Sequence, residues 1–223
     1  MSESIDVEVM VVDFWANGFG MRVRIALQEK GIHYEFKEED LRNPQKSPLV
    51  LKMNPVRKST PILIHKGSPI CDSLAILEYI DETWNEGFPL FLPKDPYEKA
   101  KARFWANFID DKLFGSQTRF LKSKGEAKEA VKKDFLEELK QLEGELGDKT
   151  YFGGDMFGFL DIVLIPYSSM FYAYERHGDY KMEAECPKLA SWVKRCIERE
   201  SVSKTLPDPV EMYEFHKKWY GTE

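Results

Sequence analysis

The chain has 223 residues and a formal net charge of -6, with 43% hydrophobic and 31% charged residues. This length supports one large domain or two modest ones, and the composition is typical of an ordinary soluble protein. The acidic balance argues against a general nucleic-acid binder, which is expected to be basic. No apolar run reaches the roughly 20 residues of a membrane span, and the first residues lack signal-peptide features, so we expect a cytoplasmic protein without a membrane partner.

The first 84 residues alternate between strand and helix patterns. A buried strand is predicted over 8–14, followed by a helix over 19–30 that stops at Gly31. Another strand over 33–37 and a short helix over 47–53 follow. The last elements of this half are a strand over 62–65, a turn at Gly67 and a helix over 73–84. The order is βαβ and then ββα.

The segment 54–84 is the most informative part of the chain. Thr60-Pro61 stands at the start of a predicted strand, where a proline does least damage, and its peptide bond is a candidate for the cis form. Asp72-Ser73 opens the next helix. A hydroxyl and unpaired N–H groups at a helix N-terminus form a site for a small anion such as a carboxylate. These residues alone predict an anion pocket without naming the anion.

The composition changes after residue 84. Residues 85–96 hold three prolines and a glycine, which predicts a linker. Only helical patterns follow, over 97–122, 126–146, 159–177 and 189–200. Asp161 falls in the first turn of a very apolar helix, where we expect a capping role in folding.

The cysteines and histidines do not form a metal-binding pattern. Cys71, Cys186 and Cys196 are widely spaced without a CxxC pair, which indicates free thiols in a reducing compartment. A helix dipole would lower the pKa of Cys71, but we favour simple packing under the turn. The four histidines are scattered, so no metal is expected.

Several stretches of the chain resemble the cytosolic glutathione transferases, and most closely the plant tau class. The likeness runs from about residue 7 to the C-terminus and is dense in the first 84 residues. The stretches that match are residues 11–15, 19–27, 29–31, 38–43, 46–49, 53–55, 54–84 and 161–166.

The resemblance implies a two-domain enzyme. The expected fold is an α/β thioredoxin-like, glutathione-binding domain over 1–84, a linker over 85–96, and an all-α domain over 97–223 with a hydrophobic substrate site. The implied reaction is conjugation of the glutathione thiolate to hydrophobic electrophilic small molecules, in detoxification and the stress response. Glutathione would be a co-substrate, with no further cofactor, and the chain would form a homodimer.

The resemblance also assigns glutathione-binding residues. Asp72 and Ser73 would hold the γ-glutamyl end, with an aspartate where most members have glutamate. The backbone of Thr60 would pair with the cysteinyl unit. Lys46 falls where a lysine meets the glycyl carboxylate. Ser59 stands where a second lysine is usual, and the neighbouring Arg57 or Lys58 would have to replace that charge.

Asn17 is the main departure from the tau pattern. A serine usually stands here and donates a hydrogen bond to the glutathione thiolate. An asparagine amide can donate the same bond, worth roughly 1.5–3 kcal/mol, or it can merely cap the helix. Both roles stay open on sequence alone. The alternative functions are a weakly active or non-catalytic carrier of hydrophobic ligands, favoured by Asn17 and Ser59, and a glutathione-dependent peroxidase.

Aromatic residues are candidates for the second substrate site. Apolar clefts suit hydrophobic ligands, although most aromatic residues at helical spacing belong to the core. We predict that Phe19, Phe114 and Trp219 face the hydrophobic substrate in a cleft between the two domains.

Overall fold

A computed structural model of the chain describes residues 8–220. The chain divides into two compact units, Met1–Leu90 and Phe91–Glu223. Within the described residues, no helix combines the length and the apolar character that a membrane crossing requires.

The first unit is built on a mixed four-stranded sheet with the strand order β2-β1-β3-β4. Strand β1 runs parallel to β2 and antiparallel to β3, and β3 runs antiparallel to β4. The strands are β1 (Val9–Asp13), β2 (Glu35–Glu38), β3 (Ile62–His65) and β4 (Ser68–Cys71), and the helices are α1 (Gly18–Glu29), α2 (Pro48–Met53) and α3 (Ser73–Thr83). This confirms the predicted order of elements and the thioredoxin-like fold of the first half.

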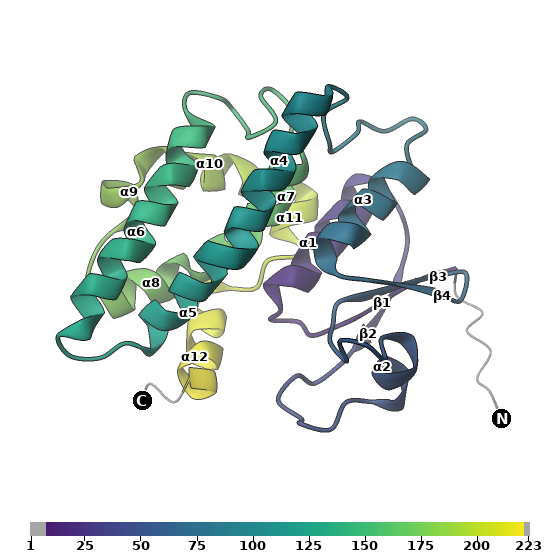
Figure 1. Cartoon of the computed structure of the whole chain (residues 1–223), viewed down its shortest axis with the longest axis horizontal. Coiled ribbons are helices and arrows are strands. Elements are labelled where there is room, and N and C mark those ends of the chain that lie inside the picture. The colour runs from purple at the N-terminus through teal and green to yellow at the C-terminus, as the bar shows by residue number, and fades with distance from the viewer. Residues whose placement is uncertain (1–7, 221–223) are drawn as a thin grey trace. The chain divides into compact units, whose positions relative to one another are not determined.

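The core of the first unit lies on both faces of the sheet. Strand β1 is buried along its whole length because it is a central strand with both faces covered. On one face Met10 and Val12 pack with Val50 and Met53 of α2. Helices α1 and α3 pack against each other on the opposite side of the sheet from α2, as Figure 1 shows. Because α1 follows β1 and α3 follows β4 in the chain, the sheet fixes where these two helices begin.

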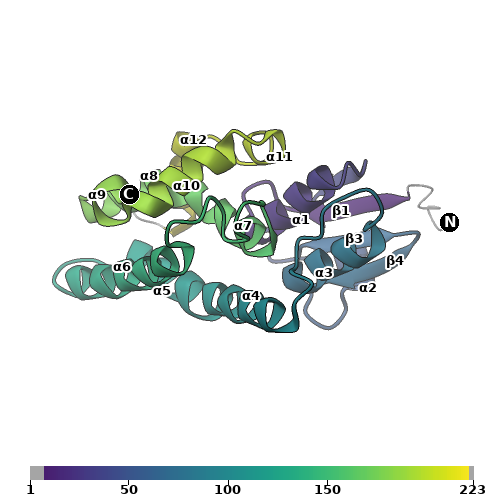
Figure 2. The same cartoon turned by 90° about the horizontal axis from the view of Figure 1, so that it is seen from above.

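The second unit is helical. Figure 2 shows α4, α5 and α6 along one side of this unit and α8 to α12 along the other, with α7 between them. The elements are α4 (Pro96–Phe108), a π-helical segment η1 (Ile109–Leu113), α5 (Phe114–Lys122), α6 (Ala127–Leu146), α7 (Phe159–Leu164), a 3-10 segment η2 (Ile165–Met170), α8 (Phe171–Gly178), α9 (Met182–Glu185), α10 (Pro187–Ile197), α11 (Glu200–Ser203) and α12 (Pro209–Tyr220).

Some helices of this unit differ from the sequence prediction. The predicted helices over 97–122 and 159–177 are each interrupted, by η1 and by η2. Segment η2 contains Pro166, whose missing N–H removes one α-helical hydrogen bond. Helices α9 and α12 were not predicted. The start of α12 carries a cap signal, because Asp208 Oδ1 accepts hydrogen bonds from the backbone N–H groups of Val210 and Glu211.

Asp161 has the capping geometry that its sequence position predicts. Its buried carboxylate accepts hydrogen bonds from the backbone nitrogens of Phe152 and Gly158, each at 2.9 Å. The indole nitrogen of Trp192 in α10 donates to the same carboxylate at 2.8 Å. One side chain therefore fixes the start of α7, the preceding loop and α10, which is a folding role.

Candidate functional site

The register of the sheet brings three turns of the first unit to one edge. Val12 of β1 lies opposite Ile62 of β3, and Ile62 lies opposite Cys71 of β4. The residues that follow β1, precede β3 and follow β4 are therefore neighbours. Both α1 and α3 begin at this edge, so their free N–H groups face the same region.

Asn17 is the N-cap of α1. Its side-chain oxygen Oδ1 accepts a hydrogen bond from Phe19 N at 3.2 Å, as a helix cap does. Its amide nitrogen Nδ2 donates to Asp13 Oδ1 at 2.7 Å. Both contacts require the same orientation of the amide group. One of the two Nδ2 hydrogens is thereby engaged, and the other is not needed for either contact.

Asp13 ends β1 and is completely buried. Its second oxygen, Oδ2, lies against α1 at Gly20, where an added Cβ would be 1.4 Å away. Among the described residues, no hydrogen bond of good geometry reaches Oδ2 or the Thr60 hydroxyl oxygen, although Thr60 and the Phe14 backbone lie near enough to the carboxyl to favour its ionised form. Burial raises the pKa of Asp13 to about 7, against the opposing effects of the Asn17 amide and the Arg24 guanidinium.

Ser73 is the first residue of α3 and is buried. Its hydroxyl oxygen accepts a hydrogen bond from Arg22 Nη1 at 3.0 Å. Arg22 is itself only 1% exposed, and its guanidinium lies over the ring of Phe19, 4.8 Å from the ring centroid. Because arginine only donates, this contact leaves the hydrogen of the Ser73 hydroxyl free to point elsewhere.

Asp72 is the N-cap of α3 and has a left-handed backbone with φ of 80°. Its Oδ1 accepts from Leu74 N at 3.1 Å, and its Oδ2 is 3.0 Å from Nη1 of Arg57. The side chains of Asp72 and Arg57 are 40% and 69% exposed. Arg57 was a candidate to replace the lysine that is missing at Ser59. In the structure it pairs with Asp72 instead.

The loop before β3 has the geometry that the sequence allowed. The Thr60-Pro61 peptide bond is cis, and Pro61 directly precedes β3. Ser59 is exposed, and its carbonyl oxygen accepts a hydrogen bond from the Asn54 amide at 2.9 Å. Lys58 is exposed with a left-handed φ of 51°.

The predicted site residues do not all lie together. Asn17, Thr60, Asp72 and Ser73 stand at the shared edge, and Ser59 is next to it in the chain. Half-buried Lys46 lies in the segment before α2, which is tied to the end of β2 because Ser47 N donates to Glu39 Oε1 at 2.9 Å. Phe19 in α1 is half-buried. Phe114 and Trp219 belong to the second unit, where 40% and 44% of their surfaces are exposed.

Sequence reasoning missed Asp13 and Arg22. Each is a charged residue inside an apolar stretch, Asp13 at the end of β1 and Arg22 between the buried Met21 and Val23 of α1. Charged residues are rarely buried without a partner, so a charge in an apolar run was the available signal. Cys71 is free and half-buried, and burial and the charge of Asp72 raise its pKa, which favours the packing role over an activated thiol.

The residues at the edge are suited to a zwitterionic ligand. A hydroxyl and helical N–H groups at Ser73 can bind a carboxylate, and the exposed Asp72 carboxylate can bind an ammonium group. The amide of Asn17 offers one more donor nearby. Within residues 8–220, no three His, Cys, Asp or Glu side chains gather as a metal site.

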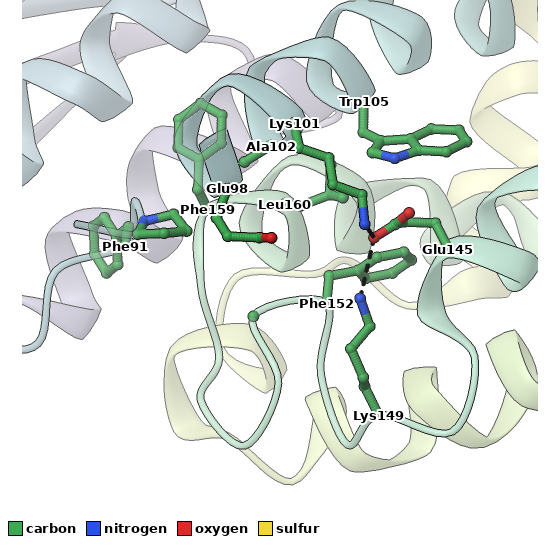
Figure 3. A pocket seen from close by; sticks show the side chains of 12 residues that line it. Phe91, Glu98, Lys101, Ala102, Trp105, Glu145, Lys149, Phe152, Phe159 and Leu160 are labelled. Carbon is green, nitrogen blue, oxygen red and sulfur yellow. Dashed lines mark hydrogen bonds and ion pairs between the residues drawn. The ribbon is translucent and has the colours of Figure 1, made fainter. Parts of the chain in front are cut away.

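A separate pocket lies within the second unit (Figure 3). Aromatic side chains, among them Trp105 and Phe152, line it together with an ionic cluster. Glu145 Oε1 lies 2.8 Å from Lys101 Nζ and 3.1 Å from Lys149 Nζ. The cavity holds about 60 Å³, far below the roughly 300 Å³ at which ligand pockets begin. Glu98 also lines it, so two lysines face two glutamates, and we assign the pocket to the packing of α4 on α7.

Comparison with known families matches both units. Residues 7–82 match the glutathione S-transferase N-terminal domain, and residues 84–200 match the C-terminal domain. The probable glutathione S-transferase parC of Nicotiana tabacum is 57% identical over 210 residues, which cover 94% of each chain. Glutathione S-transferase U25 of Arabidopsis thaliana is 55% identical over 208 residues, 93% of each chain.

Solved structures give the same result. The crystal structure of rice GST1 in complex with glutathione has a TM-score of 0.91 and 41% identity, over 98% of this chain and 99% of that one. A tau class glutathione S-transferase from mango, Mangifera indica, has a TM-score of 0.89 and 38% identity, over 94% of this chain and 97% of that one.

Proposed function

The chain belongs to the glutathione S-transferase family, as an enzyme of the plant tau class, and we propose that it conjugates the glutathione thiolate to hydrophobic electrophiles in detoxification and the stress response. The observation that carries the proposal is the contact between Arg22 and Ser73 at the N-terminus of α3. It holds a buried hydroxyl, with its hydrogen available, beside the exposed carboxylate of Asp72.

The γ-glutamyl end of glutathione fits Asp72 and Ser73. Its α-carboxylate would accept hydrogen bonds from the Ser73 hydroxyl and the first N–H groups of α3, and its ammonium group would contact Asp72. The ion pair between Asp72 and Arg57 is solvent-exposed, so it is worth at most about 1 kcal/mol and does not prevent this contact.

The cysteinyl unit would pair with the backbone of Thr60, which places its sulfur near the N-terminus of α1. Free thiols have a pKa of about 8.5, so a nearby donor is needed to favour the thiolate at neutral pH. Asn17 keeps one amide hydrogen that neither Asp13 nor Phe19 requires. We assign that hydrogen to the sulfur, together with the positive end of the α1 dipole.

The glycyl carboxylate would meet Lys46. Ser59 contributes no charge, and Arg57 is directed to Asp72, so this end is held more weakly than the γ-glutamyl end. For the hydrophobic electrophile we propose Phe19, Phe114 and Trp219, two of which expose about two-fifths of their surface. We further propose a cytoplasmic homodimer that uses glutathione as co-substrate and needs no other cofactor.

One observation favours a second candidate, a weakly active carrier of hydrophobic ligands. Both polar atoms of the Asn17 side chain have partners inside the protein, as a simple helix cap would. The two functions differ in whether the second amide hydrogen reaches the sulfur.

The test is conjugation of glutathione to a chloronitroaromatic compound, together with retention on immobilised glutathione. We expect wild type to be active and retained, and Ser73→Ala to lose at least tenfold in apparent glutathione affinity. Ser191→Ala, an exposed serine on α10, is the matched control and should equal wild type. Absence of glutathione binding at millimolar concentration would contradict the proposal, and binding of hydrophobic dyes without conjugation would favour the carrier.

A further inference from the structure

We propose that Asp13 is a positioning residue that orients the Asn17 amide and whose ionisation opposes that of the glutathione thiol. The second part rests on the proposed function, because it requires the sulfur of glutathione near Asn17. The contact between Asn17 Nδ2 and Asp13 Oδ1, at 2.7 Å, carries the inference.

The first step is orientation. An asparagine side chain can rotate by half a turn and exchange its donor and acceptor atoms. Here Asp13 Oδ1 can accept a hydrogen bond from Nδ2 but a carboxylate cannot pair with the amide oxygen, while Phe19 N is a donor and can pair with Oδ1 but not with Nδ2. The two contacts together exclude the rotated state, so the remaining Nδ2 hydrogen has a fixed direction.

The second step is the rigidity of Asp13 itself. Its side chain is fully buried, and its Oδ2 occupies the space of a side chain at position 20, because a Cβ added to Gly20 would lie 1.4 Å from it. Any side chain at position 20 would displace the carboxyl group. Gly20 is therefore needed here to give Asp13 room, and not for its backbone freedom.

The third step is electrostatic. Burial raises the pKa of the Asp13 carboxyl to about 7, because it outweighs the stabilisation of the ionised form by Asn17, Arg24, the Phe14 backbone and Thr60. The groups that face it are Asn17 and Arg24 from α1 and Thr60 from the loop before β3. Arg24 is shared, because it also interacts with Glu38 at the end of β2 and with Tyr34.

Two acids that ionise over the same pH range at neighbouring positions resist each other's ionisation. Formation of the glutathione thiolate should therefore raise the pH at which Asp13 ionises. By reciprocity, the Asp13 charge should raise the thiol pKa. The wild-type pair would then titrate over a broader range than one group alone.

The experiment has a ligand-free arm and a ligand-bound arm. The side-chain amide signal of Asn17 in ¹⁵N NMR, identified by its absence in Asn17→Ala, should shift with pH around 7 in the free protein. Glutathione should move that midpoint upward by about half a unit or more. S-methylglutathione, which occupies the same position without an ionisable thiol, should not.

The variants separate charge from shape. Asp13→Asn keeps an oxygen acceptor for Asn17 and removes the charge, so the thiol pKa of bound glutathione, followed by ultraviolet absorption, should fall by about one unit. Asp13→Ala loses the acceptor as well, and should show a lower kcat than Asp13→Asn at an unchanged KM for the electrophile. Asp134→Asn, an exposed aspartate on α6, is the control and should match wild type.

The outcomes discriminate between the two proposals. A folded Asp13→Asn protein with an unchanged thiol pKa would overturn the coupling while leaving the transferase function intact. An Asn17 amide signal that does not titrate between pH 5.5 and 8.5 would overturn it as well. Absence of any thiolate absorption in both wild type and Asp13→Asn would instead overturn the proposed function, and with it the coupling to the thiol.

Discussion

At the scale of single residues, the Asn17 side chain has two roles: it caps α1, and we propose that it donates a hydrogen bond to the glutathione sulfur. Asn17→Ala removes the helix cap, worth about 1 kcal/mol of stability, and the donor that we assign to the sulfur. We expect the conjugation rate to fall about tenfold for each 1.4 kcal/mol of transition-state stabilisation lost, with a parallel rise in the thiol pKa. Steady-state rates and thiol titration on folded protein measure this; unchanged values would make Asn17 only a cap.

Asn17→Ser tests the same site in the opposite direction. A serine hydroxyl keeps the cap but is shorter than the amide, so it does not span to Asp13 Oδ1 and its hydrogen is free for the sulfur. Because an O–H donor also makes a shorter bond than an N–H donor, we expect higher conjugation activity than in wild type. If wild type and Asn17→Ser both lack conjugation activity but still bind hydrophobic dyes, the carrier function is supported.

Asp13 should make stability depend on pH. Its folded pKa of about 7 lies above the ordinary 3.8, so the folded state binds the proton more tightly than the unfolded chain. The stability that this proton binding contributes is complete below about pH 4 and is lost as the pH rises through 7. Asp13→Asn should therefore gain stability relative to wild type between pH 4 and 8, by up to about 4 kcal/mol.

Urea unfolding of both proteins at pH 4, 6 and 8 measures this difference. Asp134→Asn, which removes an exposed charge, should follow the wild-type curve at every pH. If the free energies of unfolding of wild type and Asp13→Asn differed by the same amount at all three pH values, the folded pKa of Asp13 would not be raised into this range.

At the scale of elements, the sequence predicts the first unit better than the second. Strand β3, the turn after it and helix α3 start where the hydrophobic pattern and the turn residues place them, because period, cap and turn chemistry agree there. In the second unit the helical period continues through η1 and η2, so the breaks are not visible in the pattern. The edge that unites Asn17, Thr60 and Ser73 depends on strand register, which periodicity alone does not provide.

The packing of α1 on α3 depends on a buried ion pair. Lys30, fully buried at the end of α1, lies 2.8 Å from Asp81 of α3, and it also donates to the carbonyl oxygen of Pro89 at 2.9 Å. Lys30→Met removes one partner and leaves the buried Asp81 charge poorly compensated, which should cost about 3–5 kcal/mol of stability. The double variant Lys30→Met/Asp81→Leu should recover most of that loss in chemical unfolding.

The exposed pair of Lys133 and Glu137, at 3.9 Å, provides the control. Lys133→Met should change stability by less than about 1 kcal/mol, because exposed pairs are weak. If Lys30→Met and Lys133→Met cost the same, the buried pair does not hold α1 to α3.

At the scale of the whole molecule, both units match their family domains, and the homodimer that we propose for this 26.0 kDa chain needs an interface. Two aromatic side chains of α4, Tyr97 and Phe104, are 73% and 63% exposed. They are seven residues apart and so lie on one face of the helix. Large exposed apolar side chains on one face are typical of an interaction surface. This supports the proposed homodimer, since two-fold dimers are the commonest assemblies of a single chain.

Sedimentation equilibrium at micromolar concentration should give about twice the chain mass of 26.0 kDa. Phe104→Glu places a charge on this face of α4 and should shift the equilibrium towards monomer by at least tenfold in dissociation constant, because burying an uncompensated charge is costly. Lys99 is five residues from Phe104 and therefore lies about 140° away around α4, so Lys99→Glu alters charge on another face and should stay dimeric. A wild-type monomer would contradict the dimer, and a dimer that Phe104→Glu leaves intact would exclude this face of α4 as its interface.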